Sequence, residues 1–413
     1  AQHLIQHAGR AAGAPLRATD LARWIAAAVD GSDPALTFAD RLQRAVGIRH
    51  VHATVTGRAG LTILLRALRT LAAKDRNEVV LPAYTCYSVA ASVVKAGLRP
   101  RIVDISAETL DFDQRRLESE DLSHTLAIVA TNLYGLPNDM PFLEAIAKQR
   151  GVFLVDDAAQ ALGATVAGRA SGTWGDAGLY SFDKGKNISA IDGGAIVTSS
   201  DAVASAVARE MADLRPPFGR EDWALAIKAL AYWALLRPWL YWIPQRLPLG
   251  LGETRFTTDY PLARASRLQL ALAATMLDRL QEFNTARVSR GTALLEGLDA
   301  GGAVRPIRPL AGSMPVYLRL PLLAASPLAR DEMVRALNRA GIGATGSYPA
   351  SIADIPGLAP AAGAEQARFV AERILTVPTH PYVSQADLRR ISAVLSGTRS
   401  TAVGPREAND VTG

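Results

Sequence analysis

The stretch VFLVDDAAQALG spans residues 152–163 and joins an apolar run to two acids and a small-residue turn. An apolar run such as Val152–Val155 is typical of a buried strand in a parallel sheet. Asp156 and Asp157 stand where this strand ends, at the edge where open α/β sheets bind their ligands. A carboxylate at that edge can hold a metal, another cation or a protonated ring nitrogen. Either acid can equally serve as a plain cap of the following helix.

Short apolar runs alternate with helical patterns on both sides of this stretch. The expected helices are Ala59–Leu71, Ser88–Ala96 and Pro141–Arg150. The expected strands are His50–Val55, Glu78–Leu81, Arg101–Ile105, Leu126–Thr131, Val152–Val155, Gly178–Ser181 and Gly194–Thr198. This alternation predicts an α/β fold in which a large domain has a mostly parallel sheet sandwiched by helices.

A second, smaller α/β unit is expected toward the C-terminus. One long helical pattern covers Arg264–Ala300, and the strand Val316–Leu320 and the helices Ala329–Ala340 and Gln385–Leu395 follow it. We expect an N-terminal segment over residues 1–35 and a large domain over 36–255, with an insertion at 215–254. The long helix and the small C-terminal domain then cover 256–396, and residues 397–413 form a disordered tail.

Composition excludes several classes of protein. The 413 residues are 49% hydrophobic and 20% charged, so the chain can bury a core. The net charge of +6 is spread along the sequence, which argues against a dedicated nucleic-acid binder. The single cysteine, Cys86, excludes an intrachain disulfide and a cysteine-rich metal site. Residues 1–7 lack the features of a secretory signal, so a cytoplasmic location is expected.

The histidines do not indicate a metal site. His50 and His52 share one face of a strand, a spacing that belongs far more often to an ordinary strand than to a metal ligand pair. His380 stands in the small domain and receives no catalytic role. No metal is expected.

A lysine-bearing loop follows the strand Gly178–Ser181. Lys186 comes shortly after this strand and shortly before a glycine pair and a second strand, so it is expected near the sheet edge. Burial lowers the pKa of a lysine and makes its amine a nucleophile for Schiff-base chemistry. Lys184 is the rival, and a solvated loop lysine is the commoner case.

The turn Thr56-Gly57-Arg58-Ala59 lies between a strand and a helix. A small-residue turn at a helix N-terminus exposes backbone N–H groups and suits an anion. It can also be an ordinary tight turn.

Together these segments resemble, in order and spacing, the sugar aminotransferase family of pyridoxal phosphate enzymes named for the DegT, DnrJ, EryC and StrS proteins. The resemblance covers roughly residues 35–396. Further matching segments are Leu81–Thr85, Gly97–Pro100, Val103–Ile105, Asn132–Pro137, Ala340–Gly343 and Leu375–Pro381. It implies the aspartate aminotransferase fold (fold type I) and a homodimer. It also implies pyridoxal 5′-phosphate as cofactor, an amino acid donor, by resemblance glutamate, and a keto sugar acceptor that is nucleotide-linked.

The resemblance also assigns roles to individual residues. Lys186 would form the internal aldimine and later shuttle the proton, and Asp157 would pair with the protonated pyridine nitrogen. Gln160 would contact the phenolic oxygen of the ring. The phosphate would be held by Ser181 and by the backbone of Gly57, Arg58 and Ala59.

Two positions depart from the family pattern. Cys86 stands where relatives often carry an aromatic residue or histidine that stacks on the cofactor, and Tyr84 or Tyr87 could substitute for it. Asp259-Tyr260-Pro261 occupies the region of an Asn-Tyr-Arg motif that in relatives reaches the phosphate of a neighbouring subunit.

Residues 223–244 form a third departure, because four of the six tryptophans lie between Trp223 and Trp242. Lys228, Arg237 and Pro238 interrupt this segment, so it does not read as transmembrane. Tryptophan and tyrosine interleaved with basic residues suit a membrane interface. For this segment the alternatives are a membrane-surface aminotransferase acting on a lipid-linked or non-sugar ketone and a helical hairpin packed on the protein's own surface or at the dimer interface. The departure at Cys86 leaves a further alternative, a non-catalytic pyridoxal phosphate-binding regulator.

Overall fold

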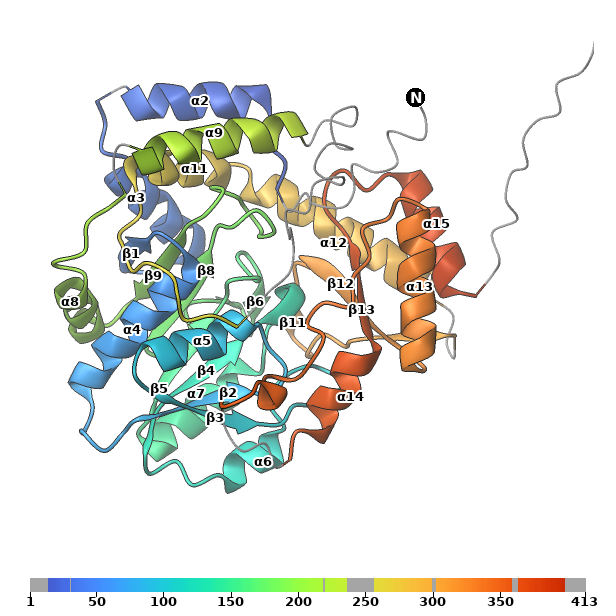
Figure 1. Ribbon diagram of the computed structural model, residues 1–413, viewed down its shortest axis with the longest axis horizontal. Coiled ribbons are helices and arrows are strands. Elements are labelled where there is room, and N and C mark those ends of the chain that lie inside the picture. The colour runs from blue at the N-terminus through green and yellow to red at the C-terminus, as the bar shows by residue number, and fades with distance from the viewer. Residues whose placement is uncertain are drawn as a thin grey trace, which may run out of the picture.

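A seven-stranded sheet forms the centre of the molecule, with the order β1-β9-β8-β5-β4-β2-β3 (Figure 1). The computed structural model describes residues 14–29, 31–217, 220–235, 256–298, 302–358 and 363–397. The sheet strands are β1 His50–Thr54, β2 Glu78–Pro82, β3 Arg99–Val103, β4 Thr125–Thr131, β5 Phe153–Asp157, β8 Ala177–Ser181 and β9 Gly194–Thr198. Only β9 runs antiparallel to its neighbours, so the carboxyl ends of the other six strands share one edge. The expected mostly parallel sheet is confirmed.

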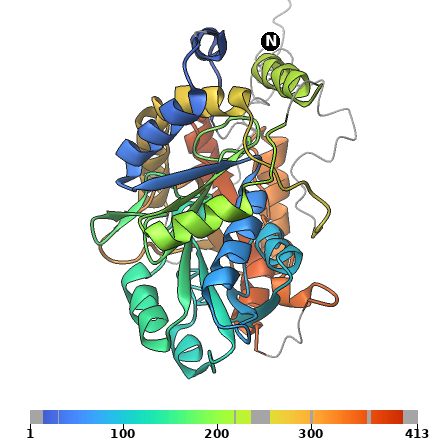
Figure 2. The ribbon, with the colours of Figure 1, turned by 90° about the vertical axis from the view of Figure 1, so that its left-hand side faces the viewer.

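Helices cover both faces of this sheet, as Figure 2 shows. Val79 and Val155 pack toward α4 Gly57–Leu71, α5 Tyr87–Lys95 and α8 Asp201–Glu210. Val80 and Leu154 point the other way, toward α6 Gln114–Ser119 and α7 Met140–Arg150. Because successive side chains of a strand point to opposite faces, each apolar strand contributes to both cores.

The N-terminal part contains two helices that the sequence pattern did not predict as elements. These are α2 Ala18–Val29 and α3 Pro34–Val46, and α3 begins after the N-cap Asp33. Both pack on α11 Arg267–Leu277, and α9 Arg220–Leu235 lies beside them (Figure 1). The segment of the chain before residue 14, including its two histidines, lies outside the described residues.

The single long helix expected over Arg264–Ala300 was wrong. The chain forms α11 and α12 Leu280–Glu296, with a break at Asp278 and Arg279. Arg279 donates to both Asp20 and Glu282, and these contacts hold its backbone in a non-helical conformation at φ −105°. A tertiary ion pair thus interrupts a helical pattern that remains continuous in the sequence.

The C-terminal α/β domain is built on a three-stranded antiparallel sheet, β10 Val304–Pro306, β12 Arg319–Ala324 and β13 Ile374–Pro378. Its helices are α13 Pro327–Arg339, α14 Glu365–Arg373 and α15 Gln385–Leu395. The strand expected at Val316–Leu320 begins later, because Tyr317 has a positive φ of 43°. The predicted tail after Gly397 lies outside the described residues.

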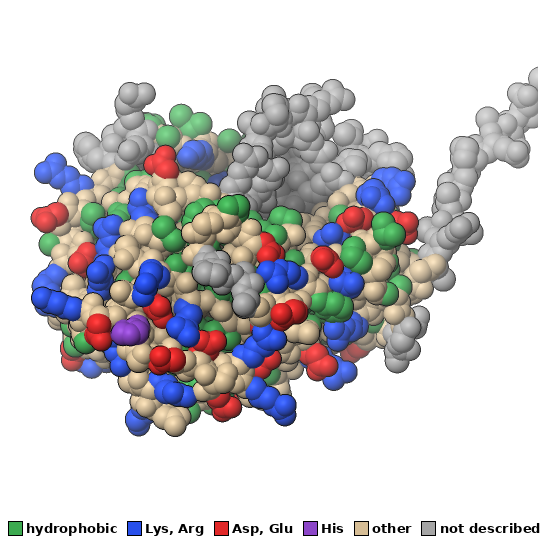
Figure 3. All heavy atoms as spheres, turned by 60° about the horizontal axis from the view of Figure 1, so that its bottom comes forward, with side chains coloured by type: hydrophobic (Ala, Val, Ile, Leu, Met, Phe, Trp, Pro, Cys, Tyr) green, Lys and Arg blue, Asp and Glu red, His purple; other side chains and the backbone are tan. Residues whose placement is uncertain are grey.

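A second three-stranded sheet is made of very short strands. β6 Thr165–Val166 pairs with β7 Arg169–Ala170 and with β11 Ser313–Met314. On the face drawn in Figure 3, basic and acidic side chains are interspersed rather than gathered in blocks. Within the described residues, none of the helices is long and apolar enough to cross a bilayer.

Candidate functional site

The expected site residues meet where β1, β5 and β8 end. Asp157 is the last residue of β5, Ser181 is the last residue of β8, and Gly57 begins α4 three residues after the end of β1. Since the three strands are parallel, their ends lie on one edge, as expected for an open α/β sheet.

The N-terminus of α4 is packed directly against Ser181. A methyl carbon added to Gly57 would lie 2.9 Å from Cβ and 3.0 Å from Oγ of Ser181, and one added to Gly194 would lie 2.6 Å from Cα of Gly57. Thr56 caps the helix by accepting a hydrogen bond from the Ala59 N–H at 3.1 Å. Backbone N–H groups at the start of a 15-residue helix next to a hydroxyl form a cradle that fits a phosphate.

The side chain of Arg58 lies over the ring of Tyr260. Its guanidinium lies 5.2 Å from the ring centroid of Tyr260, and Lys95 Nζ lies 4.6 Å from the same centroid. The Tyr260 hydroxyl is within 2.8 Å of Thr62 Oγ1 on α4. The segment Asp259-Tyr260-Pro261 therefore packs on the phosphate-cradle helix of its own chain.

The two adjacent acids of β5 have different surroundings. Asp156 is fully buried and accepts hydrogen bonds from Asn132 Nδ2 at 2.7 Å, the Gly172 N–H at 2.5 Å and the Trp174 N–H at 3.2 Å. Asp157 accepts one, from the Ala159 N–H at 3.0 Å, and interacts electrostatically with Lys186. Burial raises the pKa of both carboxyls, to about 6 for Asp156, while the charge of Lys186 acts to lower the pKa of Asp157. Asp157 is thus the acid with room for a cationic group.

The two lysines of the loop also differ. Lys184 Nζ donates to the Ile191 carbonyl at 3.4 Å and lies 3.6 Å from Asp183 Oδ1. Lys186 is half-buried, and its amine has no hydrogen-bond partner among the described residues. The charge of Lys186, rather than that of Lys184, acts to lower the pKa of Asp157.

Gln160 is held at both ends of its amide. Oε1 accepts from the Tyr134 N–H at 2.9 Å, and Nε2 donates to the Tyr348 hydroxyl at 3.0 Å. One Nε2 hydrogen is left to contact a ligand. The tight turn at Tyr134, with φ 58°, brings its N–H to this position.

Cys86 Sγ lies 2.9 Å from Ser88 Oγ, and the thiol is close enough to Tyr348 to act on the pKa of its hydroxyl. The Tyr348 ring is 5.8 Å from that of Tyr84 and 6.1 Å from that of Tyr87. Tyr84 and Tyr87, the two residues expected to substitute for an aromatic at position 86, thus both pack on Tyr348. Burial raises the pKa of Tyr84 and Tyr348, so both hydroxyls stay protonated at neutral pH.

Sequence reasoning missed several polar residues of this region. Asn132 and Tyr134 belong to a segment whose match to the family was noted, but neither received a role. Asn284 and Arg287 carry no signal in the sequence, because their burial follows from how α12 packs.

A family model matches this chain over residues 28–215 and 255–396 and leaves out the Trp-rich segment between them. Its description is the DegT/DnrJ/EryC1/StrS aminotransferase family. The chain belongs to this family. It is accordingly a pyridoxal phosphate-dependent aminotransferase, and the cradle, the carboxylate and the lysine described above fit that cofactor.

Relatives of this DegT/DnrJ/EryC1/StrS member include sugar enzymes. UDP-N-acetyl-3-dehydro-alpha-D-glucosamine 3-aminotransferase of Acidithiobacillus ferrooxidans is 27% identical over 347 residues, which are 82% of each chain. A pleiotropic regulatory protein of Geobacillus stearothermophilus is 39% identical over 139 residues, or 33% of this chain and 37% of its own length. PseC of Helicobacter pylori, an aminotransferase involved in pseudoaminic acid biosynthesis, has the same fold, with a TM-score of 0.76, 17% identity and coverage of 94% and 98%.

Proposed function

We propose that this aminotransferase moves an amino group from glutamate to the keto group of a nucleotide-linked sugar. The observation that carries the proposal is the arrangement at the sheet edge. The charge of Lys186 acts on the Asp157 carboxylate at the end of β5, and Ser181 lies against Gly57 at the start of α4, where backbone N–H groups suit an anion. Resemblance to the family supports the donor, and the relative named as a UDP-sugar aminotransferase supports the acceptor.

Each site residue has a defined task in this proposal. Ser181 and the backbone of Gly57, Arg58 and Ala59 would hold the phosphate of the cofactor, and the amine of Lys186 would hold its aldehyde carbon. When bound, the cofactor supplies an electron sink for the charge that develops on the substrate carbon.

The remaining residues would surround the ring. Asp157 would pair with the pyridine nitrogen and keep it protonated, and Gln160 would donate to the phenolic oxygen. Cys86 and Tyr348 would lie beside the ring. The free amine of Lys186 would move the proton at the substrate carbon.

The visible absorbance of the protein given pyridoxal phosphate tests this proposal. Wild-type protein should show a Schiff-base band that glutamate bleaches, and Lys186→Ala should lack it. Lys184→Ala is the matched control and should keep both the band and the bleaching. A band that survives Lys186→Ala would contradict the assignment of the lysine.

A non-catalytic, pyridoxal phosphate-binding regulator is the alternative suggested by the relative named as a regulatory protein. That relative matches only a third of this chain, and Lys186 is present here. A band that forms on Lys186 but does not respond to glutamate or other amino donors would favour the regulator.

A second candidate function is an aminotransferase that works at a membrane surface on a lipid-linked or non-sugar ketone. It is favoured by the outer face of α9, where Trp223, Ile227 and Leu230 are 73%, 63% and 47% exposed. Their spacing of four and three residues puts them on one side of the helix. Acceptor panels assayed with and without vesicles separate the two functions, because only the second gains activity from lipid.

The proposal also includes a homodimer in the cytoplasm, where the thiol of Cys86 would stay reduced. We also propose that the chain divides into a large domain over residues 36–255 and a long helix with a small C-terminal domain over residues 256–396. Analytical ultracentrifugation of the holoenzyme tests the dimer, and limited proteolysis tests the division.

A further inference from the structure

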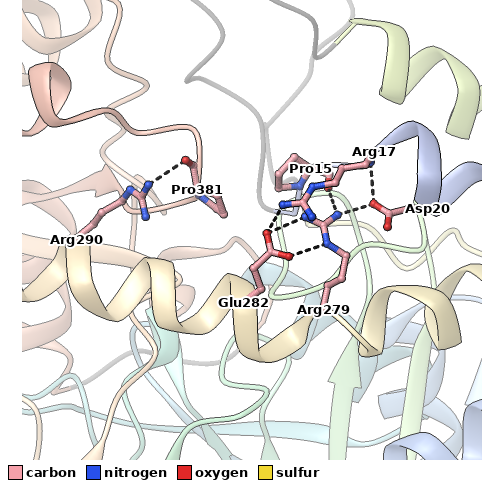
Figure 4. Close-up of polar contacts among 7 residues, drawn as sticks. All are labelled: Pro15, Arg17, Asp20, Arg279, Glu282, Arg290 and Pro381. Atoms are coloured by element: carbon pink, nitrogen blue, oxygen red, sulfur yellow. Dashed lines mark hydrogen bonds and ion pairs between the residues drawn. The ribbon is translucent and has the colours of Figure 1, made fainter.

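Three arginines at or on α12 each bind a different part of the chain. Arg279, at the start of the helix, binds Asp20 and the Pro15 carbonyl of the N-terminal segment, and Arg290 binds the Pro381 carbonyl of the C-terminal domain (Figure 4). Arg290 also binds the Val383 carbonyl. Arg287 lies between them and faces the lysine loop. The helix thus connects three segments that are far apart in the sequence.

Arg287 is fully buried and donates to the main chain of the lysine itself. Its guanidinium is 3.3 Å from the Lys186 carbonyl and 3.1 Å from the Asn187 carbonyl. It also donates to Asn284 Oδ1 at 3.2 Å. Burial lowers the pKa of Arg287 to about 9, so the guanidinium still carries its charge at neutral pH.

Asn284 connects the same group to the other half of the site. Its Nδ2 donates to the Leu162 carbonyl at 2.8 Å, two residues after Gln160, and its Oδ1 accepts from Asn187 Nδ2 at 3.3 Å. A methyl carbon added to Gly163 would lie 2.4 Å from Asn284 Nδ2, so only glycine leaves space for this approach. Asn284 and Arg287 therefore bridge the loop of Lys186 and the segment after Asp157.

We infer that Asn284 and Arg287 are positioning residues that hold the Lys186 backbone at a fixed distance from the Asp157–Gln160 segment. The planar guanidinium has five N–H donors in a rigid arrangement, and it can fix two adjacent carbonyls at once. Buried hydrogen bonds to a charged group have no water to replace them when a partner is removed. This inference rests on the proposed role of Lys186 in binding the cofactor.

Arg290 provides a matched control, because it lies three residues further along the same helix and also binds main-chain carbonyls. Those carbonyls belong to residues 286, 381 and 383, none of which is in the lysine loop. Loss of Arg290 thus removes similar chemistry from α12 without releasing Lys186.

The experiment measures how tightly and in what orientation the cofactor is held in Arg287→Gln, Arg287→Lys, Asn284→Ala and Arg290→Gln. The readouts are the dissociation constant of pyridoxal phosphate and the visible circular dichroism per bound cofactor. A third readout is the fraction of cofactor that borohydride reduction fixes on Lys186 rather than Lys184, located by peptide mass.

Arg287→Gln and Asn284→Ala should each weaken cofactor binding by about tenfold, the equivalent of one or two lost hydrogen bonds. Both should lower the dichroism and place some cofactor on Lys184. The cofactor affinity and dichroism of Arg287→Lys should lie between those of these two variants and those of wild type, because an ammonium keeps the charge but cannot reproduce the planar arrangement of donors. Arg290→Gln should stay within about twofold of wild type.

Wild-type affinity and dichroism in both Arg287→Gln and Asn284→Ala would overturn the inference, as would equal losses in Arg290→Gln. If Arg287→Gln does not fold, Asn284→Ala and Arg287→Lys decide the question. If the wild-type protein itself carries no cofactor on Lys186, the proposed function fails instead, so the two failures are distinguishable.

Discussion

The sheet edge that carries Asp157 and Ser181 and the outer face of α9 differ sharply in how well the rest of the chain packs against them. At the edge, Gly57 and Ser181 touch, and Asp156 is buried and bonded on both oxygens. On α9, the side chain of Trp223 is 73% exposed, although Leu225 and Ala229 on the inner face are buried. Contacts within the chain therefore account for the geometry of the edge. Among the residues that the structure describes, no contact accounts for the apolar outer face of α9, and an exposed apolar patch of this kind is typical of an interaction surface.

The largest effect is expected from the two acids of β5. Asp157→Asn should lower the rate of the glutamate half-reaction by about 10² to 10³, because it removes a charge placed against the reacting system, and it should leave the fold intact. Single-turnover absorbance measures that rate. Asp156→Asn should instead lower the free energy of unfolding by about 1–3 kcal/mol, because it leaves a buried N–H donor without its carboxylate acceptor.

Urea unfolding of both variants provides the control for this pair. The contrast would be contradicted if Asp156→Asn lost as much half-reaction rate as Asp157→Asn at unchanged stability. That result would mean that the more buried acid serves the cofactor.

The next effect concerns the packing of the cradle. Gly57→Ala would place its methyl group against Ser181 and push the hydroxyl away from the helix start. The expected result is a loss of pyridoxal phosphate affinity of about tenfold, because a charge-assisted phosphate contact is displaced. Gly185→Ala is the control, since a methyl group there meets nothing within 4 Å. Equal affinities for the two variants would show that the cradle does not hold the phosphate.

The two regions also differ in how pH affects the stability of the fold. Helix α9 has no acidic residue between Trp223 and Leu235, whereas several acidic residues are buried around the seven-stranded sheet. Burial raises the pKa of Asp111 to about 6, against 3.8 in the unfolded chain, so the folded protein binds more protons between about pH 4 and 6. Its contribution to the free energy of unfolding must therefore fall as the pH rises through this window and level off above it. The fall is at most about 3 kcal/mol.

Asp111→Asn isolates this contribution, because an amide does not titrate. Urea unfolding at pH 4.5 and 6.5 should show that wild type loses more stability than the variant on going to the higher pH. Parallel changes in the two proteins would mean that Asp111 titrates in its ordinary range.

The sequence predicted the strands of the seven-stranded sheet well, because they follow from local patterns, but it did not predict β10 and β13 of the C-terminal domain. Strand β9 and helix α15 begin and end where the alternation and the N-cap Ser384 indicate. The break between α11 and α12 could not be predicted, because it depends on Asp20, which is 259 residues from Arg279. Local sequence carries no record of such a contact.

The same distinction applies within the site. The order of Asp157, Ser181 and Lys186 along the chain was sufficient to place them on one edge, because parallel strands align their ends. The hydrogen bond from Arg287 to the Lys186 carbonyl could not be predicted, because an arginine in a helical pattern is normally exposed. Long-range burial, rather than the motif, determines which charged residue supports the lysine.

The outer face of α9 provides the last and smallest test, on the protein with its fold unchanged. Trp223→Ser with Ile227→Ser should change the free energy of unfolding by only about 0.5 kcal/mol, because both side chains are mostly in water. The same pair should lower co-sedimentation with anionic vesicles by about tenfold or more, because each removed side chain would otherwise bury apolar surface worth about 1.5 kcal/mol in the lipid interface.

Leu328→Ser on α13 is the matched control, since Leu328 is 75% exposed but lies on another helix. These point variants are gentler than removal of residues 223–244, because the inner face of α9 stays packed and the Tyr232 hydroxyl keeps its bond to the Lys184 carbonyl. Unchanged sedimentation in the double variant, or an equal loss in Leu328→Ser, would show that α9 does not bind membranes, and its exposed side chains would then have to meet a protein surface.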